Sequence, residues 1–567
     1  MTASHFIPVP SAHVDRFVLD RLPTPAQCAT LRFDTLELQI AAQVNLVAEL
    51  LDKAISDKGW GDQPLLRSSK ITLSYNDVQA RVNRIAQVLV DDLHLVPGNR
   101  VLLRGGNSIG MALAWLAVVK AGMIAVATMP LLRAKELGDI IDKAQPVVAL
   151  CDAKLLDELR LAQQTRPVLR TIVPFNVMDD PQGLATRAAH KDGIFCACAT
   201  ASDDPAMLAF TSGTTGTPKA AVHSHRDILA ACEAWPRHVL RALPGDSVVG
   251  SPPLAFTFGL GGLLIFPMWA GCSVYFPDAP YTPESMVDAI RTVRATICYT
   301  APTFYRQMAA FAQAKGVPSL RTSVSAGEGL PDATRLLWKE ATGLEMLDGI
   351  GATELFHIFI SSPGADVIAR RGKLSHLGIP GAPIGQVVPG YTARVVDDAG
   401  HALPHGSVGK LAVMGPTACK YLDDARQGNY VKQGWNYPGD AFVQDEEGYF
   451  YFLARDDDMI ISAGYNIGGP EVEDCLLKHP AVAECGVVGK PDTERGMVVK
   501  AYCVLRAGYQ ADALMVHVLQ EHVKAQLAPY KYPREIEFVS SLPRTETGKL
   551  QRFRLRQTAL ASSPIAG

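Results

Sequence analysis

A run of hydroxyl, glycine and lysine residues at positions 211–219 has the composition of a phosphate-binding loop. It reads Thr-Ser-Gly-Thr-Thr-Gly-Thr-Pro-Lys and follows the apolar run 207–210. Glycines let the backbone approach an anion, hydroxyls donate to phosphate oxygens, and a lysine adds a mobile positive charge. This order indicates a polyphosphate site rather than a Ser/Thr/Gly surface linker. The candidate phosphate-contacting residues are Thr211, Ser212, Gly213, Thr214, Thr215, Gly216 and Lys219.

The loop differs from a Walker A loop in two respects. Its glycines are too closely spaced, and Lys219 is followed by Ala220 instead of a Ser or Thr that could bind magnesium. A kinase or ATPase of the P-loop class is therefore disfavoured.

Four later segments complete a recognisable series. They are Ser-Ala-Gly-Glu-Gly-Leu-Pro at 325–331, Asp-Gly-Ile-Gly-Ala-Thr-Glu at 348–354, Tyr-Pro-Gly-Asp at 437–440 and Pro-Arg-Thr-Glu-Thr-Gly-Lys at 543–549. Together with the 211–219 loop, and in this order, they resemble the motifs of the adenylate-forming superfamily, which includes acyl-CoA synthetases, luciferases and peptide-synthetase adenylation domains. The resemblance spans most of the chain.

The resemblance implies how ATP and Mg2+ would be held. Attack of a carboxylate on the α-phosphate joins two anions, so the site must screen charge and align the reactants. The 211–219 loop would hold the β- and γ-phosphates, Thr353 an α-phosphate oxygen and Glu354 the magnesium ion, while Lys549 would be the catalytic lysine. The other residues that the resemblance assigns to the nucleotide are Gly327, Glu328, Asp348, Gly349, Asp440 and Arg455.

The resemblance also implies a C-terminal domain that alternates between two half-reactions. It would rotate about Asp457, and Gly464 would then lie beside the pantetheine arm of coenzyme A, where a side chain would obstruct a narrow tunnel. Lys531 and Arg534 fit either a contact with CoA phosphates or a solvated face. Gly-Gly-Pro at 468–470 departs from the usual Ser-Pro pattern without removing a charged group.

Within the superfamily, residues 348–360 resemble benzoate-CoA and 2-aminobenzoate-CoA ligases. Segments 10–17 and 251–259 indicate the 2-aminobenzoate branch. An aryl acid needs a flat apolar slot with a few polar groups at its rim. His357 could contact the acid or be a core residue, and His223 and His225 lack a third zinc ligand. The residues expected to form the slot are Thr257, Phe258, Gly327, Ile350, Gly351 and His357.

The expected reaction converts an aromatic acid and ATP to acyl-AMP and pyrophosphate, and then acyl-AMP and CoA to aryl-CoA and AMP. The alternatives are an aryl-AMP ligase that loads a carrier-protein thiol, a CoA ligase for a non-aromatic acid, a luciferase-type oxidase and a non-catalytic nucleotide-binding homologue. The presence of Lys549, Glu354 and Asp440 opposes the last of these.

Apolar runs alternate with helical segments, which predicts an α/β fold: a large N-terminal domain (1–456) of layered, largely parallel sheets with helices, and a small mobile α+β domain (457–567). The N-terminal strands are expected at 100–103, 146–151, 207–210 and 296–299, with helices at 75–93, 226–235 and 283–293. The C-terminal elements are expected to be helices at 470–478 and 511–527 and strands at 485–488, 499–505 and 535–539.

Composition limits the partners. The 567 residues carry a formal charge of -3, so no global field attracts nucleic acid. Eleven cysteines without CxxC pairs indicate a reduced protein rather than a disulfide framework or zinc site. The N-terminus lacks a secretory pattern, and the apolar stretch 110–132 fits a buried helix, a turn and a strand better than a membrane span. We therefore expect a cytoplasmic protein without membrane insertion, whose partners are the acid, ATP and CoA, with a homodimer left open.

Overall fold

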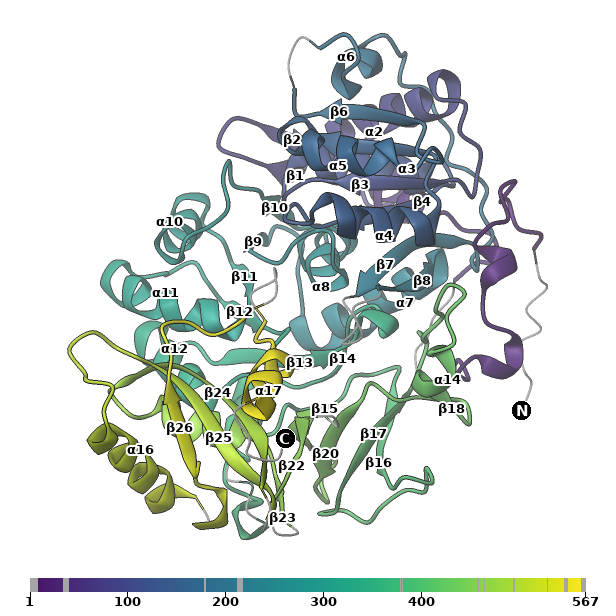
Figure 1. The fold of residues 1–567 in the computed structure, drawn as a ribbon. Coiled ribbons are helices and arrows are strands. Elements are labelled where there is room, and N and C mark those ends of the chain that lie inside the picture. Colours follow the sequence, from purple (N-terminus) through teal and green to yellow (C-terminus); the bar gives the residue numbers. More distant parts are fainter. Residues whose placement is uncertain are drawn as a thin grey trace.

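The computed structural model describes residues 9–33, 40–177, 180–211, 218–377, 379, 381–455, 458–462, 465–492, 495–527, 529–544 and 549–561. Within these ranges the strands form four sheets. Figure 1 shows a large N-terminal domain of sheets covered by helices and a smaller C-terminal domain against one side of it. The predicted α/β class is thus confirmed.

The first sheet has the order β6-β5-β3-β4-β7-β8 and is parallel except for its last strand. Its β-branched and aliphatic strands are almost wholly buried, as expected for a parallel sheet with both faces covered. Helix α3 (Ile109–Lys120) and strand β4 confirm the helix, turn and strand predicted from the apolar stretch 110–132. The strands are β3 (Arg100–Arg104), β4 (Ile124–Thr128), β5 (Val148–Asp152), β6 (Thr171–Phe175), β7 (Pro205–Thr211) and β8 (Lys219–Ser224).

The second sheet has the order β15-β14-β13-β12-β11-β9-β10-β1-β2 and is parallel from β1 to β13. One hydrophobic cluster joins residues of both sheets into a common core. The strands are β1 (Pro64–Arg67), β2 (Thr72–Ser74), β9 (Ser247–Gly250), β10 (Ser273–Tyr275), β11 (Ile297–Thr300), β12 (Thr322–Ser325), β13 (Met346–Gly351), β14 (Ile358–Ser361) and β15 (Gln386–Val387).

Helices cover these sheets where periodicity predicts them. Helix α10 has the predicted bounds, and α2 begins at the predicted residue and continues into a π-helical turn (Val88–Asp92). No helix in the described part of the chain is long and apolar enough to cross a membrane. The longer helices are α2 (Tyr75–Gln87), α4 (Ala134–Ala144), α5 (Leu156–Gln164), α7 (His225–Trp235), α10 (Pro283–Val293), α11 (Pro302–Lys315) and α12 (Asp332–Thr342).

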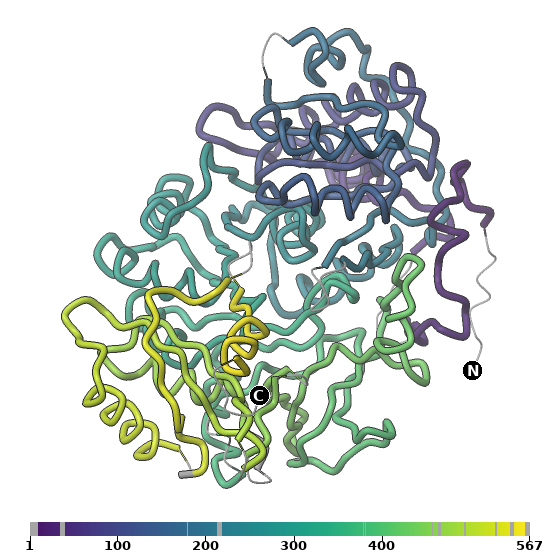
Figure 2. The backbone as a smooth tube through the Cα atoms, viewed as in Figure 1, coloured from purple at the N-terminus to yellow at the C-terminus, as the bar shows by residue number. Residues whose placement is uncertain are grey.

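A third, antiparallel sheet follows the second and carries the last part of the N-terminal domain. In Figure 2 the N-terminal segment runs beside it, where the Thr30 amide donates to the Gly434 carbonyl at 2.9 Å and the Arg32 amide to the Gly415 carbonyl at 2.9 Å. Its strands are β16 (Thr392–Val396), β17 (Val408–Met414), β18 (Val431–Lys432), β19 (Trp435–Asn436), β20 (Asp440–Gln444) and β21 (Phe450–Arg455).

The C-terminal domain has a sheet and core of its own. Every predicted element is present, but strands β24 and β25 are longer than predicted because the residues beyond their predicted ends also pair across the hairpin. The predicted boundary at 456/457 lies outside the described residues. The elements are β22 (Ile460–Ser462), β23 (Tyr465–Ile467), α15 (Gly469–Leu477), β24 (Val482–Asp492), β25 (Gly496–Leu505), α16 (Ala513–Gln526), β26 (Glu535–Phe538) and α17 (Arg552–Ala561).

Candidate active site

The 211–219 loop connects two antiparallel strands. Thr211 ends β7 and pairs across the ladder with Lys219, which begins β8, so both residues lie at the mouth of the loop. The sequence predicted a helix at 226–235 and no strand between it and the loop. Strand β8 lies between them, and the N-terminus of α7 is capped by the Ser224 hydroxyl, which accepts from the Asp227 amide at 3.2 Å. Ser212, Gly213, Thr214, Thr215 and Gly216 lie outside the described residues.

Lys219 and Glu354 are brought together by a residue that sequence reasoning missed, Tyr421. The ammonium of Lys219 donates to the Tyr421 hydroxyl at 3.0 Å and lies 3.8 Å from Glu354 Oε1, and the same hydroxyl donates to Glu354. The backbone around Tyr421 pairs with β8: the Val222 amide donates to the Lys420 carbonyl at 2.8 Å. A lone tyrosine 202 residues from its partner carries no signal in the sequence.

Thr353 and Glu354 lie on a 3₁₀ turn (Thr353–Leu355) between β13 and β14. The buried ring of His223 holds this turn, because its Nε2 lies 2.7 Å from the Thr353 carbonyl oxygen and a carbonyl can only accept. Burial lowers the pKa of His223, which keeps the ring neutral. His223 therefore supports the turn that carries Glu354.

Asp348 is buried beneath the same motif and faces a second residue that was not predicted, Arg335. A guanidinium nitrogen of Arg335 lies 3.4 Å from Asp348 Oδ2, and the Gly349 amide donates to Oδ1 at 2.9 Å. Burial raises the pKa of Asp348 to about 6, although the Arg335 cation opposes the shift. With these partners, the Asp348 carboxylate is suited to organising the end of β13.

Replacing Arg335 by methionine is expected to lower the free energy of unfolding by about 3 kcal/mol, because it leaves a buried carboxyl without its cation. Urea unfolding followed by circular dichroism measures this. Lys339→Met on the same helix removes an ion pair whose lysine is half exposed, and should cost far less. Equal losses in the two variants would contradict the structural role assigned to Arg335.

Lys549 reaches the Gly327–Glu328 loop from the C-terminal domain. A Cβ on Gly327, whose φ of +91° suits glycine, would lie 3.6 Å from Lys549 Cε. Loss of hydration among the surrounding protein atoms lowers the pKa of Lys549, while Glu328 and Glu354 oppose the shift and Arg455 adds to it. Two residues from other motifs, Glu328 and Glu354, and the strand residue Arg455 thus act electrostatically on this ammonium.

The loop itself is held by Thr303, whose hydroxyl donates to Glu328 Oε2 at 2.8 Å, and by Arg544, whose guanidinium lies 3.6 Å from Glu328 Oε1. Asp440 and Arg455 are cross-strand partners on β20 and β21, with Nη1 of Arg455 donating to Asp440 Oδ1 at 3.0 Å. Asp440 is buried and Arg455 half exposed, so the pair presents a cation at the domain junction.

An aromatic cluster lies on the other side of the Thr353–Leu355 turn. The ring of His357 lies 4.5 Å from Phe266, 5.4 Å from Trp235 and 5.7 Å from Phe258, measured between centroids. A glycine lets the His357 ring pack closely here: a Cβ on Gly261 would lie 2.6 Å from His357 Cδ2. Burial lowers the pKa of His357 to about 3, although the Phe258 backbone opposes the shift. The cluster is therefore apolar, with one neutral polar ring.

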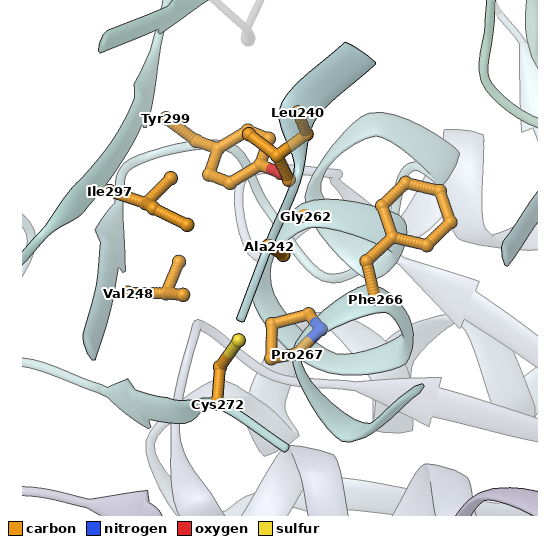
Figure 3. Close-up of a pocket in the computed structure, with 9 residues that line it drawn as sticks. All are labelled: Leu240, Ala242, Val248, Gly262, Phe266, Pro267, Cys272, Ile297 and Tyr299. Carbon is orange, nitrogen blue, oxygen red and sulfur yellow. The ribbon is translucent and has the colours of Figure 1, made fainter. Parts of the chain in front are cut away.

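The predicted slot residues fall on two neighbouring segments. Thr257 and Phe258 begin helix α8 (Thr257–Leu260), whereas Ile350 and Gly351 end β13, where a Cβ on Gly351 would lie 2.6 Å from the His357 carbonyl oxygen. Gly327 lies beside Lys549 and not with the other slot residues. Behind the cluster is the narrow apolar pocket of Figure 3, formed by Leu240, Ala242, Val248, Gly262, Phe266, Pro267, Cys272, Ile297 and Tyr299.

Glu354 fits the requirements of a magnesium ligand. It is a buried carboxylate close to the 211–219 loop, and Mg2+ usually takes one or two protein carboxylates together with substrate phosphates and water. Within the described ranges no three His, Cys, Asp or Glu side chains are grouped so as to hold a metal by themselves. A site at Glu354 would therefore depend on phosphate oxygens for its other ligands.

Four residues of the C-terminal domain were also named from the sequence: Lys531, Arg534, Asp457 and Gly464. Lys531 is buried, and its ammonium lies 2.6 Å from Glu471 Oε2, as a buried charge requires. The alternative that this lysine lies on a solvated face was therefore wrong. Arg534 donates to the Tyr532 hydroxyl at 2.9 Å. Asp457 and Gly464 lie outside the described residues. All eleven cysteines are free thiols.

Comparison with known proteins gives a consistent result. The sequence profile of the AMP-binding enzyme family matches residues 54–421, and that of the AMP-binding enzyme C-terminal domain matches residues 471–549. A benzoate–CoA ligase of Thauera aromatica is 33% identical over 524 residues, which cover 92% of this chain and 97% of that protein.

Two solved structures match over nearly their whole length. The anthranilate CoA ligase AuaEII, solved in complex with anthranoyl-AMP, gives a TM-score of 0.85 at 32% identity and covers 92% of this chain and 98% of its own. A benzoate CoA ligase from Burkholderia xenovorans gives 0.79 at 27% identity, with 90% and 100% covered.

The fold and the site thus define an enzyme of the adenylate-forming superfamily. The chain belongs to the AMP-binding enzyme family and is an acid–thiol ligase of the AMP-forming type, similar to the benzoate and aminobenzoate CoA ligases.

Proposed function

We propose that this enzyme activates a benzoate- or 2-aminobenzoate-type acid with ATP and magnesium and transfers the acyl group to coenzyme A. The observation that carries the proposal is the position of the aromatic cluster. Phe258 and His357 border the turn that bears Thr353 and Glu354, so a flat ring held there would direct its carboxylate to the nucleotide motif. The names of the relatives support the same acid class.

In the first half-reaction a carboxylate oxygen attacks the α-phosphorus, an O–P bond forms, and the bond to the pyrophosphate oxygen breaks. Lys219 and the 211–219 loop would neutralise the leaving pyrophosphate, while Asp440 would hold the ribose hydroxyls. Magnesium, held by Glu354, would supply further charge neutralisation at the phosphate oxygens. Lys549 would donate from its ammonium to the oxygens that approach each other at the α-phosphorus.

In the second half-reaction the CoA thiolate attacks the acyl carbon, a C–S bond forms, the bond between the acyl carbon and the bridging oxygen breaks, and AMP departs with that oxygen. This step needs no cation between carboxylate and phosphate, so Lys549 can leave the site. We propose a rotation of the C-terminal domain about Asp457 for this step, with Gly464 beside the pantetheine arm. The free thiols suit a reducing compartment, and we place the reaction in the cytoplasm.

The pH dependence of the adenylation rate should reflect the deprotonation of Lys549. Its protonated form is the one that stabilises the reacting oxygens, and its pKa is lowered from 10.5, so the rate should fall on the alkaline side at a lower pH than an ordinary lysine would give. In Lys549→Arg the remaining activity should persist to higher pH, because a guanidinium stays charged. Initial rates of pyrophosphate release from about pH 7 to about pH 10 give both profiles. Identical alkaline limbs would exclude Lys549 as the titrating group.

His357 should discriminate between ring substituents. In His357→Leu the slot keeps its apolar walls but loses both nitrogens, so kcat/KM for benzoate should stay within about threefold, whereas that for 2-aminobenzoate should fall by about tenfold. Phe258→Leu is the matched control and should affect both acids alike. If His357→Leu also affects both acids alike, then His357 is only a packing residue.

An acid panel tests the substrate class. The protein is incubated with ATP, magnesium and benzoate, 2-aminobenzoate, hydroxybenzoates, phenylacetate, acetate or a medium-chain fatty acid, and pyrophosphate is measured. Preference for an aryl acid supports the proposal. Preference for acetate or the fatty acid would favour the non-aromatic alternative, and pyrophosphate release without acylation of CoA would favour a carrier-protein acceptor.

A further inference from the structure

The C-terminal domain contacts the N-terminal domain through the C-terminal half of one helix, α15. In Figure 1 this domain lies against the side of the second sheet that bears α11 and α12. Two polar contacts cross the junction there. Asp474 Oδ1 accepts from the Ala333 amide at 2.9 Å, and Arg306 Nη2 donates to the Leu477 carbonyl at 3.1 Å.

The first contact places a carboxylate at the N-terminus of α12. This helix begins after Pro331, whose side chain cannot accept a hydrogen bond, so its first amides need partners from outside the helix. Asp474 supplies one of them, and a negative charge at the positive end of a helix is favourable. Lys478, the residue directly after α15, has its ammonium 2.8 Å from the same carboxylate and helps to orient it.

The second contact places a cation, Arg306, at the C-terminus of α15. Leu477 is the last residue of α15, where carbonyl groups lack intrahelical donors and carry partial negative charge. Arg306 on α11 donates to one of them, and burial lowers the pKa of its guanidinium, with nearby Arg506 adding to the shift. In the first contact α15 supplies a carboxylate, and in the second it supplies a carbonyl to a cation of the N-terminal domain. Because the two contacts are not interchangeable, both can form in only one orientation of α15.

The position of α15 also fixes the segment that carries Lys549, through Glu473 and Arg552. Glu473, the neighbour of Asp474, accepts from Arg552 Nη2 at 2.6 Å and from the Val487 amide at 2.8 Å. Arg552 begins α17, three residues after Lys549. A chain of short contacts thus joins the N-terminal domain to the lysine that reaches Gly327.

We infer that Asp474 and Arg306 are positioning residues that hold the C-terminal domain in the orientation in which Lys549 enters the active site. The inference rests on the proposed function for its consequence in catalysis. Neither residue touches the nucleotide motifs. Loss of either contact should therefore impair the half-reaction that needs Lys549 and spare the other.

The test compares both half-reactions in Asp474→Ala and Arg306→Ala. Acid-dependent pyrophosphate release should fall by about tenfold in each, the value expected for losing one charge-assisted hydrogen bond. Acylation of CoA from a supplied aryl adenylate should stay within about twofold. Arg306→Lys should recover part of the lost rate, because it restores a donor. Equal loss in both half-reactions, or no loss in either, would overturn the inference.

Matched controls remove the same kinds of contact inside one domain. Asp512→Ala removes a carboxylate that accepts from the Met515 amide at the N-terminus of α16, and Arg291→Ala removes a guanidinium that donates to the Gly316 carbonyl at 3.2 Å. Both controls should leave the two half-reactions in their wild-type ratio.

Hydrogen–deuterium exchange at the Ala333 amide tests the contact without any activity. Exchange should be faster in Asp474→Ala and Arg306→Ala than in wild type, and unchanged in both controls. If wild type turns over no acid but exchange responds in this way, the proposed function fails while the docking contacts stand. If wild type is active and exchange at Ala333 is the same in every variant, the inference fails while the proposed function stands.

Discussion

Lys549→Ala is expected to lower acid-dependent pyrophosphate release by about 100- to 1,000-fold, the usual cost of removing one preorganised donor to a developing negative charge. The ammonium lies beside Gly327 and is electrostatically coupled to Glu328 and Glu354, so it stands among the residues assigned to ATP. Alanine removes the cation where carboxylate and phosphate approach each other. Coupled measurement of pyrophosphate with saturating acid and ATP gives the loss in kcat.

The same variant should acylate CoA from a supplied aryl adenylate at close to the wild-type rate, because that step proceeds without the cation. Lys524→Ala, which removes an ammonium 2.8 Å from Glu521 on a helix of the same domain, is the matched control and should change neither step. Retained pyrophosphate release in Lys549→Ala would remove this lysine from the mechanism.

Glu354→Gln should show the second large effect, a fall of about 100-fold in pyrophosphate release with a higher magnesium requirement. Glutamine keeps the size of the side chain and an acceptor for the Tyr421 hydroxyl, but it loses the charge that balances Lys219 and would bind the ion. Rates measured over a magnesium titration separate a weaker ion site from a slower step.

Tyr421→Phe serves as the control for Glu354. It removes the hydroxyl between Lys219 and Glu354 but leaves both charges in place, so the magnesium requirement should stay near that of wild type while the rate falls less. An unchanged magnesium requirement in Glu354→Gln would place the ion elsewhere.

Local patterns in the sequence predict most of the fold. Helix α10 has its predicted bounds, because Thr282 and Pro283 give an N-cap and a first helical residue, and apolar residues then recur at helical spacing. Strand β8 was missed as a separate element. Its residues 219–224 follow the loop directly, and only pairing with β7 distinguishes them from a continuation of the loop.

The site was predictable where residues belong to a contiguous motif and not where the fold brings distant segments together. Asp440 and Arg455 were named from motifs, and the ladder makes them partners. Tyr421 and Arg335 were missed, because each acts through a carboxylate on another segment of the chain. Tyr421 donates to Glu354, and Arg335 pairs with Asp348. Hydrophobic periodicity and motif spacing do not predict such contacts between separate segments.

One chain is proposed to couple the adenylation of an aryl acid to the acylation of CoA. The most direct measurement incubates the purified enzyme with ATP, magnesium and benzoate or 2-aminobenzoate, with and without CoA, and quantifies AMP, pyrophosphate and aryl-CoA by mass spectrometry. With CoA present, AMP, pyrophosphate and aryl-CoA should form in equal amounts. Without CoA, pyrophosphate release should stop near one equivalent per enzyme. Formation of ADP, or no dependence of AMP on the aryl acid, would contradict the proposed coupling.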